Sequence, residues 1–178
     1  MLHRWVYRIA MATAAAYGVP VHAQAVQAVH EYKLKAALVY NFALFTDWPQ
    51  NVAGEGGPLQ LCFGADSAMR PALTELNDKQ VKGRRIVARA ITDFDKARTC
   101  HLMFMDGTDR ERWSLARSVL RSAPLLTISD DPEIGRTGAV ISLYLENNRI
   151  AFDIDLQAVR DAHLTLSSKL LRLARKTQ

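Results

Sequence analysis

Few residues of this chain combine the types and the spacing that catalysis requires. His30, His101 and His163 lie beyond the N-terminal leader described below, and none stands at the His-x-x-x-His or Glu-x-x-His spacing of a metal site. His101 falls in an apolar run, where a hydrogen-bonded core imidazole is commoner than a ligand. No Gly-x-Ser-x-Gly elbow occurs, and residues 167–169 lack the Ser-x-x-Lys spacing of a β-lactamase nucleophile. We therefore predict that the protein is not an enzyme and that it has no catalytic residue, metal or cofactor.

Two groups of charged residues could bind a ligand or a partner. Asp130 and Asp131 follow a predicted parallel strand, and open α/β sheets place sites at the carboxyl ends of their strands. The adjacent Pro132 equally fits a turn that ends the strand. Basic residues of the last strand and the last two helices would surround an anion if those elements pack side by side. The alternative is that these residues are solvated charges on the surface. The candidate contacts from both groups are Asp130, Arg149, Arg160 and Lys169.

The N-terminal residues have the composition of a secretory signal peptide. Basic residues stand between positions 3 and 8, an apolar segment spans 9–19, and a small-residue cleavage site lies near Ala23. An N-terminal helix of the folded domain is the alternative. We predict a signal peptide at residues 1–23, a single domain at residues 24–178, and export of the mature protein.

Export to an oxidising compartment would favour a disulfide between the cysteines. The chain has two cysteines, and an even number in an oxidising compartment favours a disulfide. Cys62 and Cys100 are the one available pair, and two separate buried thiols are the alternative.

Length and composition fit one globular domain. The chain has 178 residues, of which 49 % are apolar and 23 % charged, so it can bury a core that folds alone. Loss of Arg4 and Arg8 with the leader lowers Lys plus Arg from 23 to 21 against 18 Asp plus Glu, and the net charge falls from +5 to +3. A charge this small and evenly spread argues against a nucleic-acid partner.

Helices and strands alternate along the mature chain. Apolar residues at helical spacing predict a long helix over residues 29–48 that stops at Trp48-Pro49. Strands are predicted over residues 59–63, 84–91, 100–105 and 125–128, and helices over 67–76, 110–122, 155–162 and 167–176. This order is typical of an α/β fold. We expect a single layered domain with a mixed sheet, central parallel strands and a C-terminal β-hairpin, flanked by helices.

The hairpin has the clearest local pattern. Residues 139–145 and 149–156 alternate apolar and polar side chains on either side of a short turn at residues 146–148. The core face is predicted to hold Ile141, Leu143, Leu145, Ile150, Phe152 and Ile154.

Residues 35–49, with the sequence KAALVYNFALFTDWP, resemble the opening motif of the YfiR family. That motif has a basic residue, small residues, Tyr-Asn-Phe, a further Phe and then Trp-Pro. The residues that carry the family signature here are Tyr40, Asn41, Phe42, Phe45, Trp48 and Pro49. The likeness continues in order through Leu61-Cys62, Cys100-His101 and residues 126–130, 150–154 and 166–174.

The resemblance implies a periplasmic regulatory protein. Family members of the best-known type inhibit an inner-membrane diguanylate cyclase by binding its periplasmic sensor domain, and release switches on cyclic-di-GMP synthesis and biofilm formation. An outer-membrane lipoprotein with an OmpA-like domain competes for the repressor, oxidation state governs its activity, and a homodimer is implied. Cys62 and Cys100 match one cysteine pair of that type, and the second pair has no counterpart here. A periplasmic sensor that binds a small ligand is the alternative function.

Overall fold

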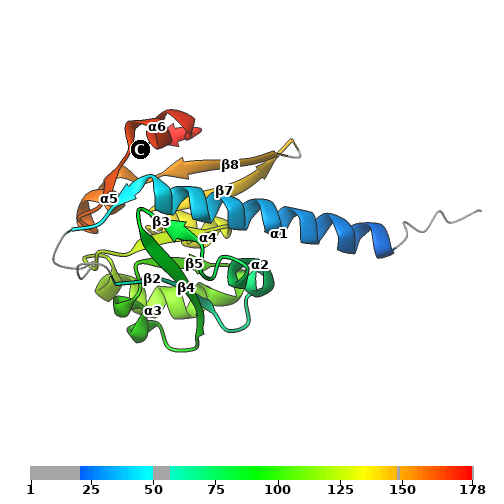
Figure 1. Ribbon diagram of the computed structural model, residues 1–178, viewed down its shortest axis with the longest axis horizontal. Coiled ribbons are helices and arrows are strands. Elements are labelled where there is room, and N and C mark those ends of the chain that lie inside the picture. Colours follow the sequence, from blue (N-terminus) through cyan, green and yellow to red (C-terminus); the bar gives the residue numbers. More distant parts are fainter. Residues whose placement is uncertain (1–20, 50–56, 148, 178) are drawn as a thin grey trace, which may run out of the picture.

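A mixed β-sheet with helices on both faces organises the molecule (Figure 1). The computed structural model describes residues 21–49, 57–147 and 149–177. The helical elements are α1 (Val21–Leu44), α2 (Arg70–Thr74), η1 (Phe94–Thr99), η2 (Gly107–Asp109), α3 (Arg110–Leu120), α4 (Pro132–Arg136), α5 (Leu156–Asp161) and α6 (Ser168–Leu173). The strands are β1 (Thr46–Asp47), β2 (Leu59–Gly64), β3 (Gln80–Val81), β4 (Arg84–Ile91), β5 (Leu102–Met105), β6 (Leu126–Ser129), β7 (Ile141–Glu146), β8 (Arg149–Ile154), β9 (Thr165–Leu166) and β10 (Lys176–Thr177).

Parallel strands form the centre of the main sheet. In the described residues this sheet has eight strands in the order β10-β8-β7-β6-β5-β2-β4-β3, and the five central strands β7, β6, β5, β2 and β4 are parallel to one another. Every residue of β5 and β6 is buried, as expected for parallel strands covered on both faces. With the antiparallel β7–β8 hairpin, this arrangement confirms the predicted fold class.

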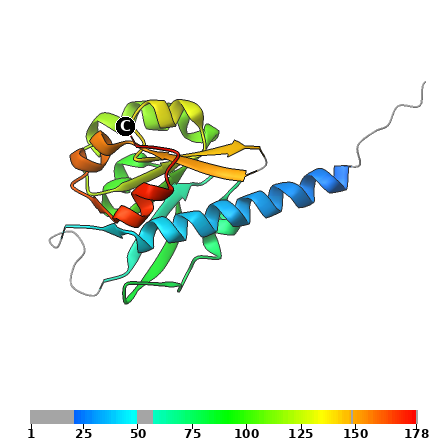
Figure 2. The same ribbon diagram turned by 90° about the horizontal axis from the view of Figure 1, so that it is seen from above.

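Two apolar cores lie on the two faces of the sheet. Alternation along β2 directs Leu61 and Phe63 into the core that α1 and α2 cover, and Cys62 into the core that η1, α3 and α4 cover. Figure 2 shows α1 and the green α3 region on opposite sides of the strands. The sheet therefore carries one packed layer on each side.

Helix α1 ends earlier than the sequence predicts. The amide of Phe45 bonds to the carbonyls of Asn41 and Phe42, and the chain then enters β1, which pairs with β9 in a separate small sheet. The predicted end at Trp48 is therefore wrong, because a long-range strand pairing replaces the last helical turn. The helix begins at Val21, within the predicted leader, whose residues 1–20 lie outside the described part of the chain.

The hairpin forms as predicted, with Ile141 opposite Ile154, but Glu146 of the predicted turn lies in β7 opposite Arg149. One predicted core residue is misplaced, because Leu145 is 57 % exposed. The tip of the hairpin extends past the body of the domain (Figure 1), and Leu145 lies near that tip, which accounts for its exposure. Asn148 of the predicted turn lies outside the described residues.

Helix α4 replaces the turn considered at Pro132. The Asp131 side chain accepts hydrogen bonds from the amides of Glu133 and Ile134, and Pro132 occupies the first helical turn. A capping aspartate followed by proline is a helix start, since proline fits the first turn and lacks only an amide that would be unpaired there.

Candidate functional site

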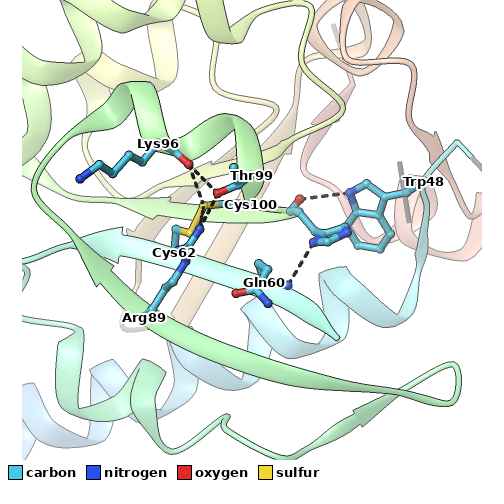
Figure 3. The surroundings of a disulfide bond; sticks show 8 residues. Trp48, Gln60, Cys62, Arg89, Lys96, Thr99 and Cys100 are labelled. Carbon is cyan, nitrogen blue, oxygen red and sulfur yellow. Dashed lines mark hydrogen bonds between the residues drawn. A yellow bond between two sulfur atoms is a disulfide. The ribbon is translucent and has the colours of Figure 1, made fainter. Parts of the chain in front are cut away.

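A disulfide between Cys62 and Cys100 joins β2 to the segment that enters β5 (Figure 3). The two Cα atoms are 6.0 Å apart, within the usual range for a bridge, and both residues are buried. Strands β2 and β5 are parallel neighbours, with Leu61 beside Leu102. The predicted disulfide is present, and it fixes the end of the β4–β5 connection against the centre of the sheet.

Arg89 of β4 lies beside this bridge. Its Nη2 atom is 3.7 Å from the Sγ atom of Cys100 and donates to the hydroxyl of Thr99 at 2.5 Å. Its Nε atom is buried without a hydrogen-bond partner. Arg89 therefore links β4 to the segment that carries Cys100.

Cys100 is followed by His101, on which the tryptophan of the family signature docks (Figure 3). Trp48 Nε1 donates to the His101 carbonyl at 3.1 Å, and the two rings meet edge to face with centroids 6.2 Å apart. The His101 Nδ1 atom accepts from the Gln60 amide at 3.0 Å, so the imidazole is a bonded core group as predicted. The disulfide therefore holds the segment that receives Trp48.

The other signature residues fasten α1 to the sheet. Phe42 is buried and packs edge to face on Phe152, with ring centroids 5.0 Å apart. The Tyr40 hydroxyl donates to the Gln80 carbonyl at 2.8 Å. The Phe45 carbonyl, beside β1, accepts from the Ser167 amide at 2.9 Å.

Two signature residues have simpler surroundings. Asn41 is exposed on α1, and Pro49 is half-buried directly after Trp48. Most of the motif therefore specifies how the helix docks and offers little surface to a partner.

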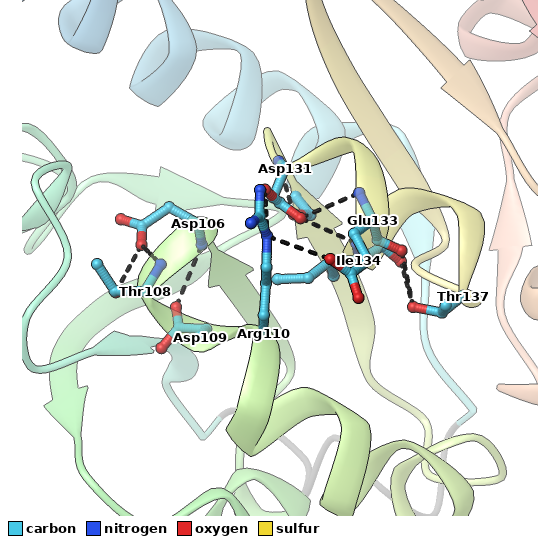
Figure 4. A network of polar contacts seen from close by, with 9 residues as sticks. Asp106, Thr108, Asp109, Arg110, Asp131, Glu133, Ile134 and Thr137 are labelled. Atoms are coloured by element: carbon cyan, nitrogen blue, oxygen red, sulfur yellow. Dashed lines mark hydrogen bonds and ion pairs between the residues drawn. The ribbon is translucent and has the colours of Figure 1, made fainter.

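A network of carboxylates lies at the carboxyl edge of the parallel strands (Figure 4). Strands β2 and β5 are neighbours, but the strand that follows β2 lies on one side of this pair and the strand that follows β5 lies on the other. The connections thus diverge between β2 and β5, and α/β sheets often bind ligands at such a switch point. Here Asp106 accepts from Ser67 at 2.7 Å and caps η2. Asp109 is fully buried and bonds Arg112 at 2.8 Å. Burial raises the pKa of Asp109, which its bond from the Asp106 amide partly offsets.

Asp131 belongs to the same edge. It accepts from Arg110 Nη2 at 2.5 Å and Nε at 2.9 Å while it caps α4. The hydrogen bond from Arg110 holds the pKa of Asp131 below its usual value. These carboxylates are all occupied by partners within the protein.

Asp130, a predicted contact residue, pairs with Lys35 of α1. Lys35 Nζ lies 2.7 Å from Asp130 Oδ2 and 2.6 Å from Glu31 Oε1. Burial lowers the pKa of Lys35, but the hydrogen bonds to Asp130 and Glu31 outweigh it and the net shift is upward. Burial raises the pKa of Asp130, with the bond to Lys35 opposing it. The pair ties α1 to the end of β6, and no sequence signal connects residues so far apart.

The predicted basic contacts do not converge on one anion. Arg149 lies at the hairpin tip, and Arg160 lies on α5 beyond the other end of β8, where it donates to Gln157 at 2.7 Å. Lys169 is exposed in the first turn of α6. Arg149 therefore lies at the start of β8 and Arg160 beyond its end.

Neither a metal site nor a membrane span occurs in the part of the chain that the structure describes. Within residues 21–49, 57–147 and 149–177, no three His, Cys, Asp or Glu side chains are grouped to hold a metal ion. None of the described helices has the length and apolarity to cross a bilayer.

The family model for YfiR/HmsC-like proteins matches residues 32–175, which include the signature, both cysteines and the carboxyl edge. The chain belongs to the YfiR/HmsC-like family. The family consists of periplasmic regulatory proteins that act in signalling.

Two solved structures have weaker likeness to this chain. A conserved domain protein from Vibrio cholerae O1 biovar El Tor is 12 % identical, over 69 % of this chain and 55 % of that one, with a TM-score of 0.48. The ABC domain in complex with L-Trp from Streptococcus pneumoniae is 8 % identical, over 68 % of this chain and 55 % of that one, with a TM-score of 0.47. The chain thus spans about half the length of each.

Proposed function

We propose that this protein is exported by a cleaved leader at residues 1–23 and represses a membrane-bound diguanylate cyclase from the periplasmic side. The observation that carries the proposal is the family match across residues 32–175. Repression of this kind requires that the protein bind the inactive conformation of the cyclase sensor domain more tightly than the active one, because equal affinity shifts no equilibrium.

The projecting part of α1 is our proposed contact with the cyclase. This half of the helix extends beyond the body of the domain in both views (Figures 1 and 2). Val29 in the first half of α1 is 54 % exposed and Leu34, just past the middle of the helix, is 46 % exposed, while Lys35 anchors the helix to Asp130. A rigidly held helix with exposed aliphatic side chains can enter a groove of a partner without first being ordered. The OmpA-like lipoprotein and a second copy of this chain would compete for the same side chains.

Redox control would act through the single disulfide. Loss of the bridge frees Cys100 from β2 and loosens the His101 segment on which Trp48 rests. Trp48 and β1 directly follow α1, so the docking of the helix weakens with them. Reduction therefore lowers the fraction of protein that presents α1 in its binding position.

Cellular cyclic-di-GMP in a strain that lacks this protein tests the proposal. We expect the level to rise on deletion and to return when residues 1–178 are expressed, but to stay high when residues 24–178 are expressed without a leader. A level that does not change on deletion, or that the leaderless form restores, would contradict periplasmic repression.

A further inference from the structure

A groove with a positively charged rim lies between α3, the α4–β7 connection and α5, apart from the disulfide and the carboxyl edge. Its volume is about 640 Å³, within the range of small-molecule sites. Arg117 and Arg121 line it from α3, and Arg136 lines it from the last turn of α4. Figure 1 shows α3 and α5 at the same end of the molecule.

The three arginines of the lining differ in their contacts with the described residues. Arg121 bonds Asp161 at 2.6 Å, whereas the side chains of Arg117 and Arg136 make no ion pair or hydrogen bond with any residue that the structure describes. Asp155 is the one acidic residue in the lining, and it accepts the Ala158 amide as the cap of α5. The lining thus carries an excess of positive charge, which a concave surface concentrates.

Arg117 and Arg136 each lie near the C-terminal end of a helix, which gives one structural reason for a positive charge at these positions. A cation in the last turn stabilises the helix dipole, and both Arg117 and Arg136 stand there. The interaction with the helix dipole does not explain why the two arginines, which belong to different helices, line the same groove. Hydroxyl groups of Ser114 and Ser118 add donors to the same lining, whereas the Thr137 hydroxyl already donates to the Glu133 carbonyl.

We propose that this groove binds a small dianion that carries carboxylate or phosphate groups. Guanidinium groups recognise both through paired, charge-assisted hydrogen bonds, and two unpartnered arginines match two negative charges. The lining is more polar than apolar, which favours a compact polar ligand over a lipid or an aromatic one. The inference goes beyond the repression of a cyclase and does not depend on it.

Trp113 provides a reporter inside the groove. Its indole Nε1 donates to the Thr137 hydroxyl at 2.9 Å on the groove wall, whereas Trp48 lies beside His101 in another part of the molecule. Leader removal takes away Trp5, so the mature protein gives two indole N–H signals in a nitrogen-15 spectrum. One signal reports the groove and the other is an internal control.

The experiment titrates the mature protein with succinate and, separately, with glycerol 3-phosphate at constant ionic strength. We expect the Trp113 signal to shift saturably with at least one probe by about 10 mM, which would fill even a site of about 1 mM affinity. The Trp48 signal should stay in place, and the neutral analogues succinamide and glycerol should have no effect. The probe that saturates at lower concentration identifies the preferred anionic group.

Matched variants test the assignment. Arg117→Gln with Arg136→Gln should weaken binding by about tenfold or more, because both charge-assisted contacts are lost. Arg98→Gln with Arg172→Gln removes the same charge from exposed positions elsewhere and should leave binding intact. The proposal is overturned if neither probe gives a saturable Trp113 shift, or if the groove variant binds as tightly as the control variant.

Discussion

Reduction of the Cys62–Cys100 disulfide should lower the free energy of unfolding by about 4 kcal/mol. The cysteines are 38 residues apart in sequence, and the chain-entropy model gives this value for a loop of that length at 25 °C. For a domain of about 150 residues, each kcal/mol shifts the melting temperature by about 2–4 °C. The reduced protein should therefore melt about 8–16 °C below the oxidised protein.

Thermal unfolding followed by far-UV circular dichroism, with and without dithiothreitol, measures this difference. Reduced wild-type protein is the cleaner comparison, because alanine at buried Cys62 also removes the volume of a sulfur atom from the core. The double variant Cys62→Ala/Cys100→Ala is the control, and its melting temperature should not respond to the reductant. A wild-type shift below about 2 °C would refute the reasoning, since the bridge would then constrain little of the unfolded chain.

Three further predictions concern other parts of the structure. Gly64→Ala should destabilise the domain by about 1–3 kcal/mol in urea unfolding, because the new Cβ would collide with the buried Asp109 carboxylate. Arg175→Gln should lower the stability of the domain to urea at neutral pH, since both oxygens of buried Asp153 accept hydrogen bonds from Arg175 and would lose them. That bond lowers the folded-state pKa of Asp153, so the stabilisation is present above its ordinary pKa and disappears as pH falls through the lowered value. Leu34→Glu should raise the Kd for the cyclase sensor domain about tenfold or more, because a charge would enter an apolar contact.

Each of these predictions has an outcome that contradicts it. Gly64→Ala with wild-type stability would mean that Asp109 can move freely. A loss on Arg175→Gln that persists unchanged at pH 2 would show that the ion pair is not its cause. Leu115→Glu on α3, at a side chain that is 75 % exposed, is the matched control for α1, and equal weakening by both changes would exclude a specific role for the helix.

Local patterns predicted where several strands lie. Residues 84–91 form β4 with the predicted bounds, and the hairpin strands at 141–146 and 149–154 lie close to the predicted ranges 139–145 and 149–156. The predicted position of Cys62, on the opposite face from Leu61 and Phe63, is confirmed, because side chains along a strand alternate between its two faces. The parallel centre of the sheet followed from the order of helices and strands.

Features set by distant contacts were not predictable in this way. The pairing of β1 with β9 and the bond from Lys35 to Asp130 join residues that no local pattern connects. The exposure of Leu145 depends on how far the hairpin extends past its neighbours. Arg117 and Arg136 were ordinary surface charges in the sequence, and only packing of α3 near α4 places them in one groove.

Spheroplasts of the deletion strain offer the most direct test of periplasmic repression. Purified oxidised protein is added to the outside of the cells, and cyclic-di-GMP is measured inside them over time. We predict that the wild-type protein lowers the internal level and that Leu34→Glu fails to do so at the same concentration. An internal level that the wild-type protein leaves unchanged would contradict repression from the outer face of the inner membrane.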